Sequence, residues 1–221
     1  MHIIFIVFIL VSVFHIIVIA LQKEKLRQIS KCLLMPLLLA AFIAGGGVKY
    51  PLVIPALILG WIGDVLLIQI QKKNFMMLGL SSFLTGHIFY IAALIGVLGI
   101  FGSGGAFRNI NIPAILIFTP PAVVLGMVIY RLIKPTKEMA APVIVYMAVL
   151  EILTLFGFQV FLHNPGIAGL LLLSGCICFM VSDTILAYYT FRKLKVSGSI
   201  LLMSYYILAQ AEIAIGLLLL K

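Results

Sequence analysis

The segment from Pro51 to Lys73 reads PLVIPALILGWIGDVLLIQIQKK. Up to Ile70 it contains a single charged side chain, Asp64, and two lysines follow the apolar run. About 20 mainly apolar residues suffice for a helix that crosses a bilayer. The segment therefore predicts a membrane-spanning helix with an aspartate inside it and basic residues at one end.

The rest of the chain has the same character. Of its 221 residues, 64% are hydrophobic and 10% are charged, whereas a soluble domain has about 25% charged residues. We therefore predict an all-α polytopic membrane protein with a single transmembrane domain over residues 1–221. The apolar segments predict eight spans, at roughly 2–21, 32–44, 51–70, 75–99, 112–133, 139–161, 166–189 and 199–220.

The basic residues give this arrangement an orientation. The formal net charge of +9 does not indicate nucleic acid binding, because Lys and Arg lie in short clusters between apolar segments. With eight spans, Lys49, Arg108 and Lys221 fall on one side of the membrane and all other basic residues on the other. The positive-inside rule places the more basic side in the cytoplasm and both termini outside, in an inner or plasma membrane. The residues on this basic side are Lys23, Lys25, Arg27, Lys31, Lys72, Lys73, Arg131, Lys134, Lys137, Arg192, Lys193 and Lys195.

Four of the six acidic residues lie inside predicted spans: Asp64, Glu151, Asp183 and Glu212. A charged side chain at the centre of a membrane helix costs about 2.5–3.5 kcal/mol on insertion scales. Such residues usually face the protein interior or a wet cavity, and they often mark a functional site. Glu151 and Glu212 lie near the middle of their spans and suggest no specific role.

The two aspartates are expected at the same depth. Asp64 and Asp183 each lie six residues before the predicted end of a span, about 9 Å from the cytoplasmic end. Tyr206 falls at a comparable depth, Gln210 lies one turn further on the same face, and His87 lies about a turn deeper, so these side chains can line one cavity open to the cytoplasmic leaflet. A structural interpretation stays open for each of them, as buried groups that hydrogen-bond neighbouring helices.

A short internal match adds to this picture. The segment that begins at Gly63-Asp64 resembles the one that begins at Ser182-Asp183, 119 residues later, and the same offset relates His87 to Tyr206. Four helices separate the copies, which would give two parallel four-helix repeats. Apolar helices also produce short matches of this kind by chance.

Four motifs on four predicted helices carry a family resemblance. They are Gly63-Asp64, Phe83-x-x-Gly86-His87-x-x-Tyr90, Ser182-Asp183-x-x-Leu186-Ala187 and Tyr206-x-x-Ala209-Gln210. With these motifs the chain, from Lys31-Cys32 to the last helix, resembles the YhhN family of membrane proteins, which includes the lysoplasmalogenases.

The resemblance implies hydrolysis of the vinyl-ether bond of a lysoplasmalogen in the membrane, with no cofactor and no protein partner. Asp64 and Asp183 match the two intramembrane aspartates of the family, and we expect them to be catalytic. One carboxylic acid protonates the β-carbon of the vinyl ether, and one carboxylate activates water and stabilises the oxocarbenium ion, as in glycosidases. The expected supporting residues from these motifs are His87, Tyr90, Ser182, Tyr206 and Gln210.

The phosphate of such a substrate requires a cation at the cytoplasmic rim, and Lys31 is our candidate, although an ordinary interfacial lysine is an equal interpretation. A catalytic zinc usually takes three protein ligands, and only His87 lies at the right depth, so we expect no metal. Two other classes of function stay open: a transporter or channel that uses the acids as a proton or cation site, and a lipid-binding structural protein.

Overall fold

The computed structural model describes residues 2–99, 110–191 and 196–220, and within these ranges it contains helices and no strand. The prediction of an all-α polytopic protein is confirmed. Two short 3₁₀ segments, Gly47–Lys49 and Leu67–Gln69, flank the third helix. The α-helices are α1 His2–Ala20, α2 Glu24–Ala44, α3 Val53–Leu66, α4 Lys73–Val97, α5 Ile112–Ile133, α6 Lys137–His163, α7 Ile167–Phe191 and α8 Val196–Leu219.

Seven of these helices are long and apolar enough to cross a membrane, and the exception is α3. With the 3₁₀ turn that follows it, the third helix covers Val53–Gln69, close to the predicted span 51–70. Because the 3₁₀ turn rises more steeply than an α-helix, Asp64 lies about 9 Å from the end of this segment. The chain is therefore a multi-pass membrane protein.

The start of the second helix differs from its predicted position. The predicted span began at residue 32, but α2 begins at Glu24. The carboxylate of Glu24 accepts hydrogen bonds from Arg27 and Gln28, one turn later, and these bonds support two polar turns that precede the apolar part of the helix. Lys31 is therefore part of α2, about 10 Å from its first residue, and not part of a loop.

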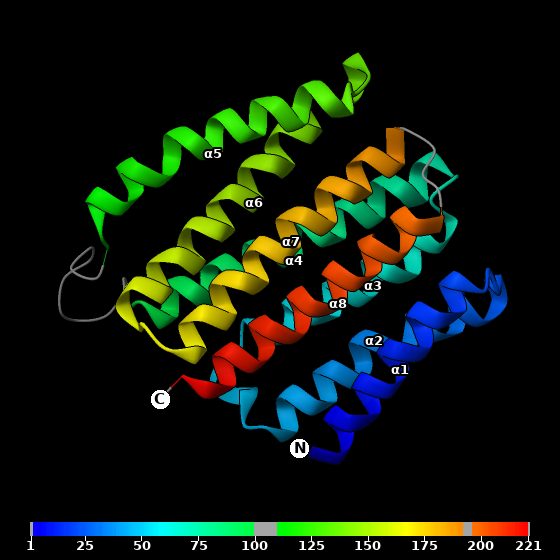
Figure 1. Ribbon diagram of the computed structural model, residues 1–221, viewed down its shortest axis with the longest axis horizontal. Coiled ribbons are helices and arrows are strands. Elements are labelled where there is room, and N and C mark those ends of the chain that lie inside the picture. The colour runs from blue at the N-terminus through cyan, green and yellow to red at the C-terminus, as the bar shows by residue number, and fades with distance from the viewer. Residues whose placement is uncertain (1, 100–109, 192–195, 221) are drawn as a thin grey trace.

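The eight helices form a bundle with a central group and two flanks (Figure 1). The central group is α3 packed on α4 and α7 packed on α8. Helices α1 and α2 flank this group on one side, and α5 and α6 flank it on the other. Of these, α5 is the least embedded, since its only buried residues are Ala114 and Ile133.

Consecutive helices run in opposite directions, so the start of α1 and the end of α8 lie at the same end of the bundle (Figure 1). We call the opposite end, where α1, α3, α5 and α7 finish, the basic end. The basic residues placed there are Lys23, Lys25, Arg27, Lys31, Lys72, Lys73, Arg131, Lys134 and Lys137. Arg108, Arg192, Lys193, Lys195 and Lys221, which also entered the orientation argument, lie outside the described residues.

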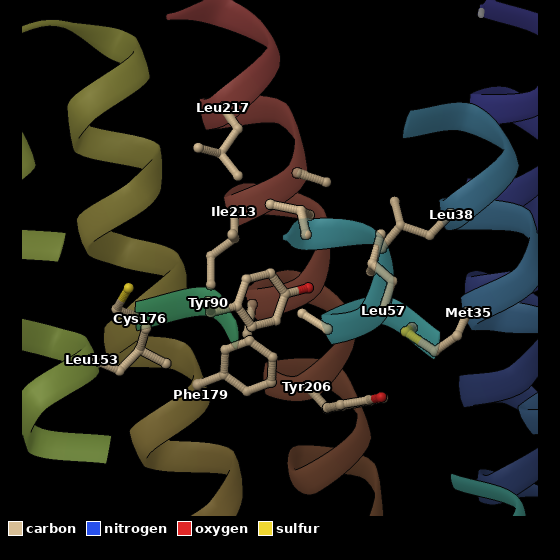
Figure 2. Packing of buried hydrophobic residues seen from close by; sticks show 14 of the residues in the cluster. Met35, Leu38, Leu57, Tyr90, Leu153, Cys176, Phe179, Tyr206, Ile213 and Leu217 are labelled. Atoms are coloured by element: carbon tan, nitrogen blue, oxygen red, sulfur yellow. The ribbon is translucent and has the colours of Figure 1, made fainter. Parts of the chain in front are cut away.

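Small residues allow the central helices to approach closely. A Cβ atom at Gly175 of α7 would lie 3.1 Å from the carbonyl oxygen of Ala209 on α8. Close backbone contact of this kind is typical of helix pairs in membranes. Figure 2 shows the packed side chains of this core, in which Phe179 of α7 and Tyr90 of α4 lie beside α8.

Candidate functional site

Asp64 is buried among three helices, with 1% of its surface exposed. The hydroxyl of Tyr206 on α8 donates a hydrogen bond of 2.8 Å to its Oδ2 atom. The ammonium nitrogen of Lys31 on α2 lies 3.3 Å from its Oδ1 atom. Each carboxylate oxygen of Asp64 therefore has a partner, and one of these partners is a cation.

Asp183 is buried as well, with 6% of its surface exposed, but its partners differ. The hydroxyl of Tyr146 on α6 donates a hydrogen bond of 2.6 Å to its Oδ2 atom. The Nε2 atom of His87 on α4 lies 3.6 Å from the same oxygen. Within the described part of the chain, no Lys or Arg forms an ion pair with Asp183.

An aromatic side chain joins the two aspartate environments. The ring of Phe179 on α7 meets the imidazole of His87 edge-on, with centroids 4.9 Å apart. It also contacts the ring of Tyr206 at 6.1 Å. Figure 2 shows Phe179 and Tyr206 on neighbouring helices, with the Tyr206 hydroxyl directed toward α3. His87, which lies beside Asp183, and Tyr206, which binds Asp64, thus both contact the ring of Phe179.

A hydrogen-bonded chain extends from Tyr206 to α4. Tyr90 donates its hydroxyl proton to Oε1 of Gln210, and Nε2 of Gln210 lies 3.4 Å from the Tyr206 hydroxyl, to which it donates. A Cβ atom at Gly60 of α3 would lie 3.0 Å from the Gln210 amide nitrogen and 3.3 Å from the Tyr206 hydroxyl. Glycine at position 60 therefore leaves space for this chain one turn before Asp64.

The contacts of the two aspartates follow the 119-residue offset found in the sequence. Asp64 and Asp183 are separated by this offset, and so are His87 and Tyr206. Asp64 contacts Tyr206, and Asp183 contacts His87. In each case, an aspartate of one half meets a side chain of the other half. The two-repeat interpretation stays a prediction, but this pair of exchanged contacts is what it requires.

Most of the site residues expected from the sequence come together in one buried cluster. It contains Asp64, Asp183, Lys31, His87, Tyr90, Tyr206 and Gln210. Ser182 lies elsewhere, because its hydroxyl donates to the carbonyl oxygen of Leu202 on α8 and so links α7 to α8. The position of Lys31 differs from the rim position that we expected, since its ammonium group faces Asp64.

Sequence reasoning did not identify Tyr146. No motif marks it, and a phenol inside a predicted span was its only signal. Glu151 and Glu212 lie outside the cluster: Glu151 is partly exposed beside Gly126, and Oε2 of Glu212 is buried without a hydrogen-bond partner in the described structure.

A cavity of about 360 Å³ adjoins Asp183. It lies between α4, α5, α6 and α7, and Tyr146 and Asp183 form part of its wall. Asp64 and Lys31 do not line it. Among the described residues, no three His, Cys, Asp or Glu side chains are grouped so that they could hold a metal ion.

The fold and the site define a multi-pass membrane protein with a buried pair of aspartates in its helix bundle. The chain belongs to the YhhN family, whose model matches residues 26–217. The matched range contains all residues of the cluster described above. No curated protein and no solved structure matches the chain.

Proposed function

We propose that this protein is an intramembrane hydrolase that cleaves the vinyl-ether bond of lysoplasmalogens, giving a fatty aldehyde and a glycerophospho-head group. The observation that carries the proposal is the pair of buried aspartates with different partners: Asp64 next to a lysine ammonium group, and Asp183 next to a phenol, an imidazole and an apolar cavity. Membership of the YhhN family, which includes lysoplasmalogenases, supports the same substrate class.

The two environments suit two different roles. The ammonium group of Lys31 stabilises the carboxylate form of Asp64 by direct charge pairing. Among the residues that the structure describes, no Lys or Arg pairs with Asp183, and we assign it the role of the acid. Two carboxyl groups whose surroundings favour different protonation states can act as acid and base in one reaction.

The proposed reaction begins with transfer of the Asp183 proton to the β-carbon of the vinyl ether. The double-bond electrons form the new C–H bond and leave an oxocarbenium ion. The negative charge of the Asp64 carboxylate stabilises this ion through space, because Asp64 does not line the cavity. Water adds to this cation, and the proton that it loses returns to the carboxylate pair. The resulting hemiacetal collapses, its hydroxyl proton passes to the ether oxygen, and aldehyde and alcohol separate.

Deuterium incorporation tests this reaction. Purified protein in detergent is incubated with lysoplasmalogen in heavy water, and the aldehyde is analysed by mass spectrometry. We expect one carbon-bound deuterium in the aldehyde, next to the carbonyl group. Release of aldehyde without that deuterium would contradict protonation at carbon, and absence of aldehyde would contradict the proposed activity.

A proton- or cation-coupled transporter or channel is the second candidate. The Lys31–Asp64 ion pair inside the bundle favours it, because buried charge pairs in membrane helices also occur along ion pathways. The detergent assay separates the two candidates. Detergent-solubilised protein has no gradient across a membrane, so a transporter would release no aldehyde under these conditions.

We also propose an orientation, with the basic end in the cytoplasm and both termini outside, in an inner or plasma membrane. The concentration of basic residues at one end supports it. Single cysteines introduced at Lys72 and Lys134 into a cysteine-free variant are expected to resist an impermeant thiol reagent in intact cells and to react after the cells are opened. Labelling of either position in intact cells would contradict this orientation.

A further inference from the structure

The cavity beside Asp183 has an almost entirely apolar wall. Two threonines on α7, Thr184 and Thr190, line it, but their hydroxyls donate to the carbonyl oxygens of Met180 and Leu186 in the same helix. The hydroxyl protons of both threonines are therefore already engaged in hydrogen bonds within α7. Apart from Asp183, its hydroxyl partner on α6 and Ser81 on α4, this wall suits a hydrocarbon ligand.

The dimensions of the cavity suit one chain and not two. Its wall extends along α6 from Met139 to Leu150, a rise of about 16 Å at 1.5 Å per residue. The hydrocarbon core of a bilayer is about 30 Å thick, so the cavity is about as deep as one leaflet. Its volume of about 360 Å³ is near the lower limit of ligand sites, which span about 300–1,000 Å³.

The α5 side of the cavity is the expected route of access from the bilayer. Residues Ile129 and Ile133 of α5 line it opposite α4. Helix α5 packs mainly on α6 and α7, without extensive packing on α4, and it lies at the edge of the bundle (Figure 1). A chain that already lies in the bilayer can therefore enter between α4 and α5.

Three lysines at the basic end of the bundle lie close in sequence to residues that line the cavity. Lys73 precedes the lining residue Met77 by one turn of α4, and Lys137 begins α6 immediately before the lining residues of that helix. Lys134 follows Ile133 directly at the end of α5. Lys73 pairs with the exposed carboxylate of Glu138 at 3.1 Å, which leaves a positive excess at this rim. Such an excess complements a phosphate group.

We propose that this cavity binds the single hydrocarbon chain of a lysophospholipid, with the phosphate at the lysines of the rim and the chain against Asp183. The proposal rests on the proposed function for the identity of the reacting bond, but not for the binding itself. It replaces Lys31 by Lys134 and Lys137 as the phosphate ligands, because the ammonium group of Lys31 is engaged by Asp64.

Photo-cross-linking tests the location of the chain without any turnover. The probe is a hexadecyl ether lysophospholipid with a diazirine in the chain, which lacks the vinyl double bond and is not a substrate. In bilayer discs, we expect labelled peptides from α4 between Met77 and Leu84 and from α6 between Met139 and Leu150. Labels concentrated on bilayer-facing residues such as Leu116 and Val124 would overturn the proposal.

Two adjacent substitutions on α6 provide a matched comparison. Val143 lines the cavity and is buried, whereas Ile144 is 54% exposed and does not line it. We expect Val143→Phe to lower labelling of the cavity by the hexadecyl probe about tenfold, the change that 1.4 kcal/mol produces. Labelling by a probe with an octyl chain should fall less. Labelling of the cavity in Ile144→Phe should equal that in the wild-type protein. Equal labelling of the two variants would overturn the proposal, and the wild-type labelling pattern decides it if Val143→Phe does not fold.

The same preparations separate this inference from the proposed function. Cavity labelling together with absence of aldehyde from lysoplasmalogen would remove the enzymatic proposal and keep the chain site. Aldehyde release together with labels outside the cavity would remove the chain site and keep the enzymatic proposal. Lys134→Gln combined with Lys137→Gln should weaken labelling by the lysophospholipid probe and leave labelling by a phosphate-free hexadecyl alcohol probe unchanged. An equal loss of labelling with both probes would show that Lys134 and Lys137 do not bind the phosphate.

Discussion

Asp64 and Asp183 lie 119 residues apart in two similar sequence motifs. Their surroundings nevertheless differ in charge. Asp64 faces an ammonium group and a phenol, away from the cavity. Asp183 faces a phenol and an imidazole, on the wall of the cavity. Two similar motifs thus have different surroundings, because α2 and α8 supply the partners of Asp64 and α6 and α4 supply the partners of Asp183.

The largest expected effect comes from removal of either carboxyl group. Asp64→Asn and Asp183→Asn keep nearly the same volume but can neither hold a charge nor donate a carboxyl proton. Loss of a general acid or base typically lowers the rate about 10²–10⁴-fold, and we expect at least the lower value for each variant. Rates of aldehyde release by purified variants measure it. Activity near that of the wild type would remove the aspartate in question from the mechanism.

The two variants should differ in stability, which sharpens the comparison. Asp64→Asn leaves the Lys31 ammonium group, whose side chain is 13% exposed, without its carboxylate. An unsatisfied buried polar group costs about 1–3 kcal/mol, and the partial exposure of Lys31 places the cost toward the lower value. Asp183→Asn leaves no cation behind. Thermal unfolding in detergent should therefore show a lower midpoint for Asp64→Asn than for Asp183→Asn. Equal midpoints would indicate that the ion pair contributes little.

Removal of the cation should have the next largest effect on activity. Lys31→Met deprives Asp64 of the charge that favours its carboxylate form, so kcat should fall about tenfold or more while KM changes little. Lys25→Met, an exposed lysine of the same helix, is the matched control. A raised KM with an unchanged kcat would instead assign Lys31 to the phosphate, as the sequence first suggested.

The hydroxyl partners of the aspartates should contribute less. Tyr206→Phe removes a hydrogen bond to the Asp64 carboxylate, and a bond to a charged group contributes about 1.5–3 kcal/mol. Tyr146→Phe removes a hydrogen bond to the neutral carboxyl group of Asp183, and such a bond contributes about 0.5–1.5 kcal/mol. We expect roughly tenfold lower kcat for Tyr206→Phe and a smaller loss for Tyr146→Phe. Tyr188→Phe on α7, whose side chain is 40% exposed, is the control. If Tyr146→Phe retains full activity, Tyr146 does not position Asp183.

The smallest effect concerns the packing beneath Tyr206. A Cβ atom at Gly60 would press on Gln210 and Tyr206, whereas one at Gly96 on α4 would meet nothing within 4 Å. Gly60→Ala should lower activity severalfold by shifting the Tyr206 hydroxyl. Gly96→Ala should leave activity unchanged and raise the unfolding temperature slightly, since alanine favours a helix by about 1 kcal/mol over glycine. Equal behaviour of the two variants would contradict close packing at Gly60.

Apolar length and charge placement predicted the helical class, because membrane helices must satisfy their own backbone. The same logic identified Asp64 and Asp183, since an acid inside a span is costly and therefore conspicuous. The polar start of α2 was missed because its first two turns are stabilised by local pairs such as Glu24–Arg27. The cavity, and Tyr146 beside it, depend on how α5 and α6 pack, which no local pattern specifies.

We propose that Asp183 carries the proton and Asp64 the negative charge in the resting protein. Infrared spectroscopy observes this directly, because a protonated carboxyl group has a carbonyl band that a carboxylate lacks and that shifts in heavy water. The account predicts that a band of this kind in the wild-type protein disappears in Asp183→Asn and persists in Asp64→Asn. Loss of the band in Asp64→Asn, with the band intact in Asp183→Asn, would contradict the account and exchange the roles of the two aspartates.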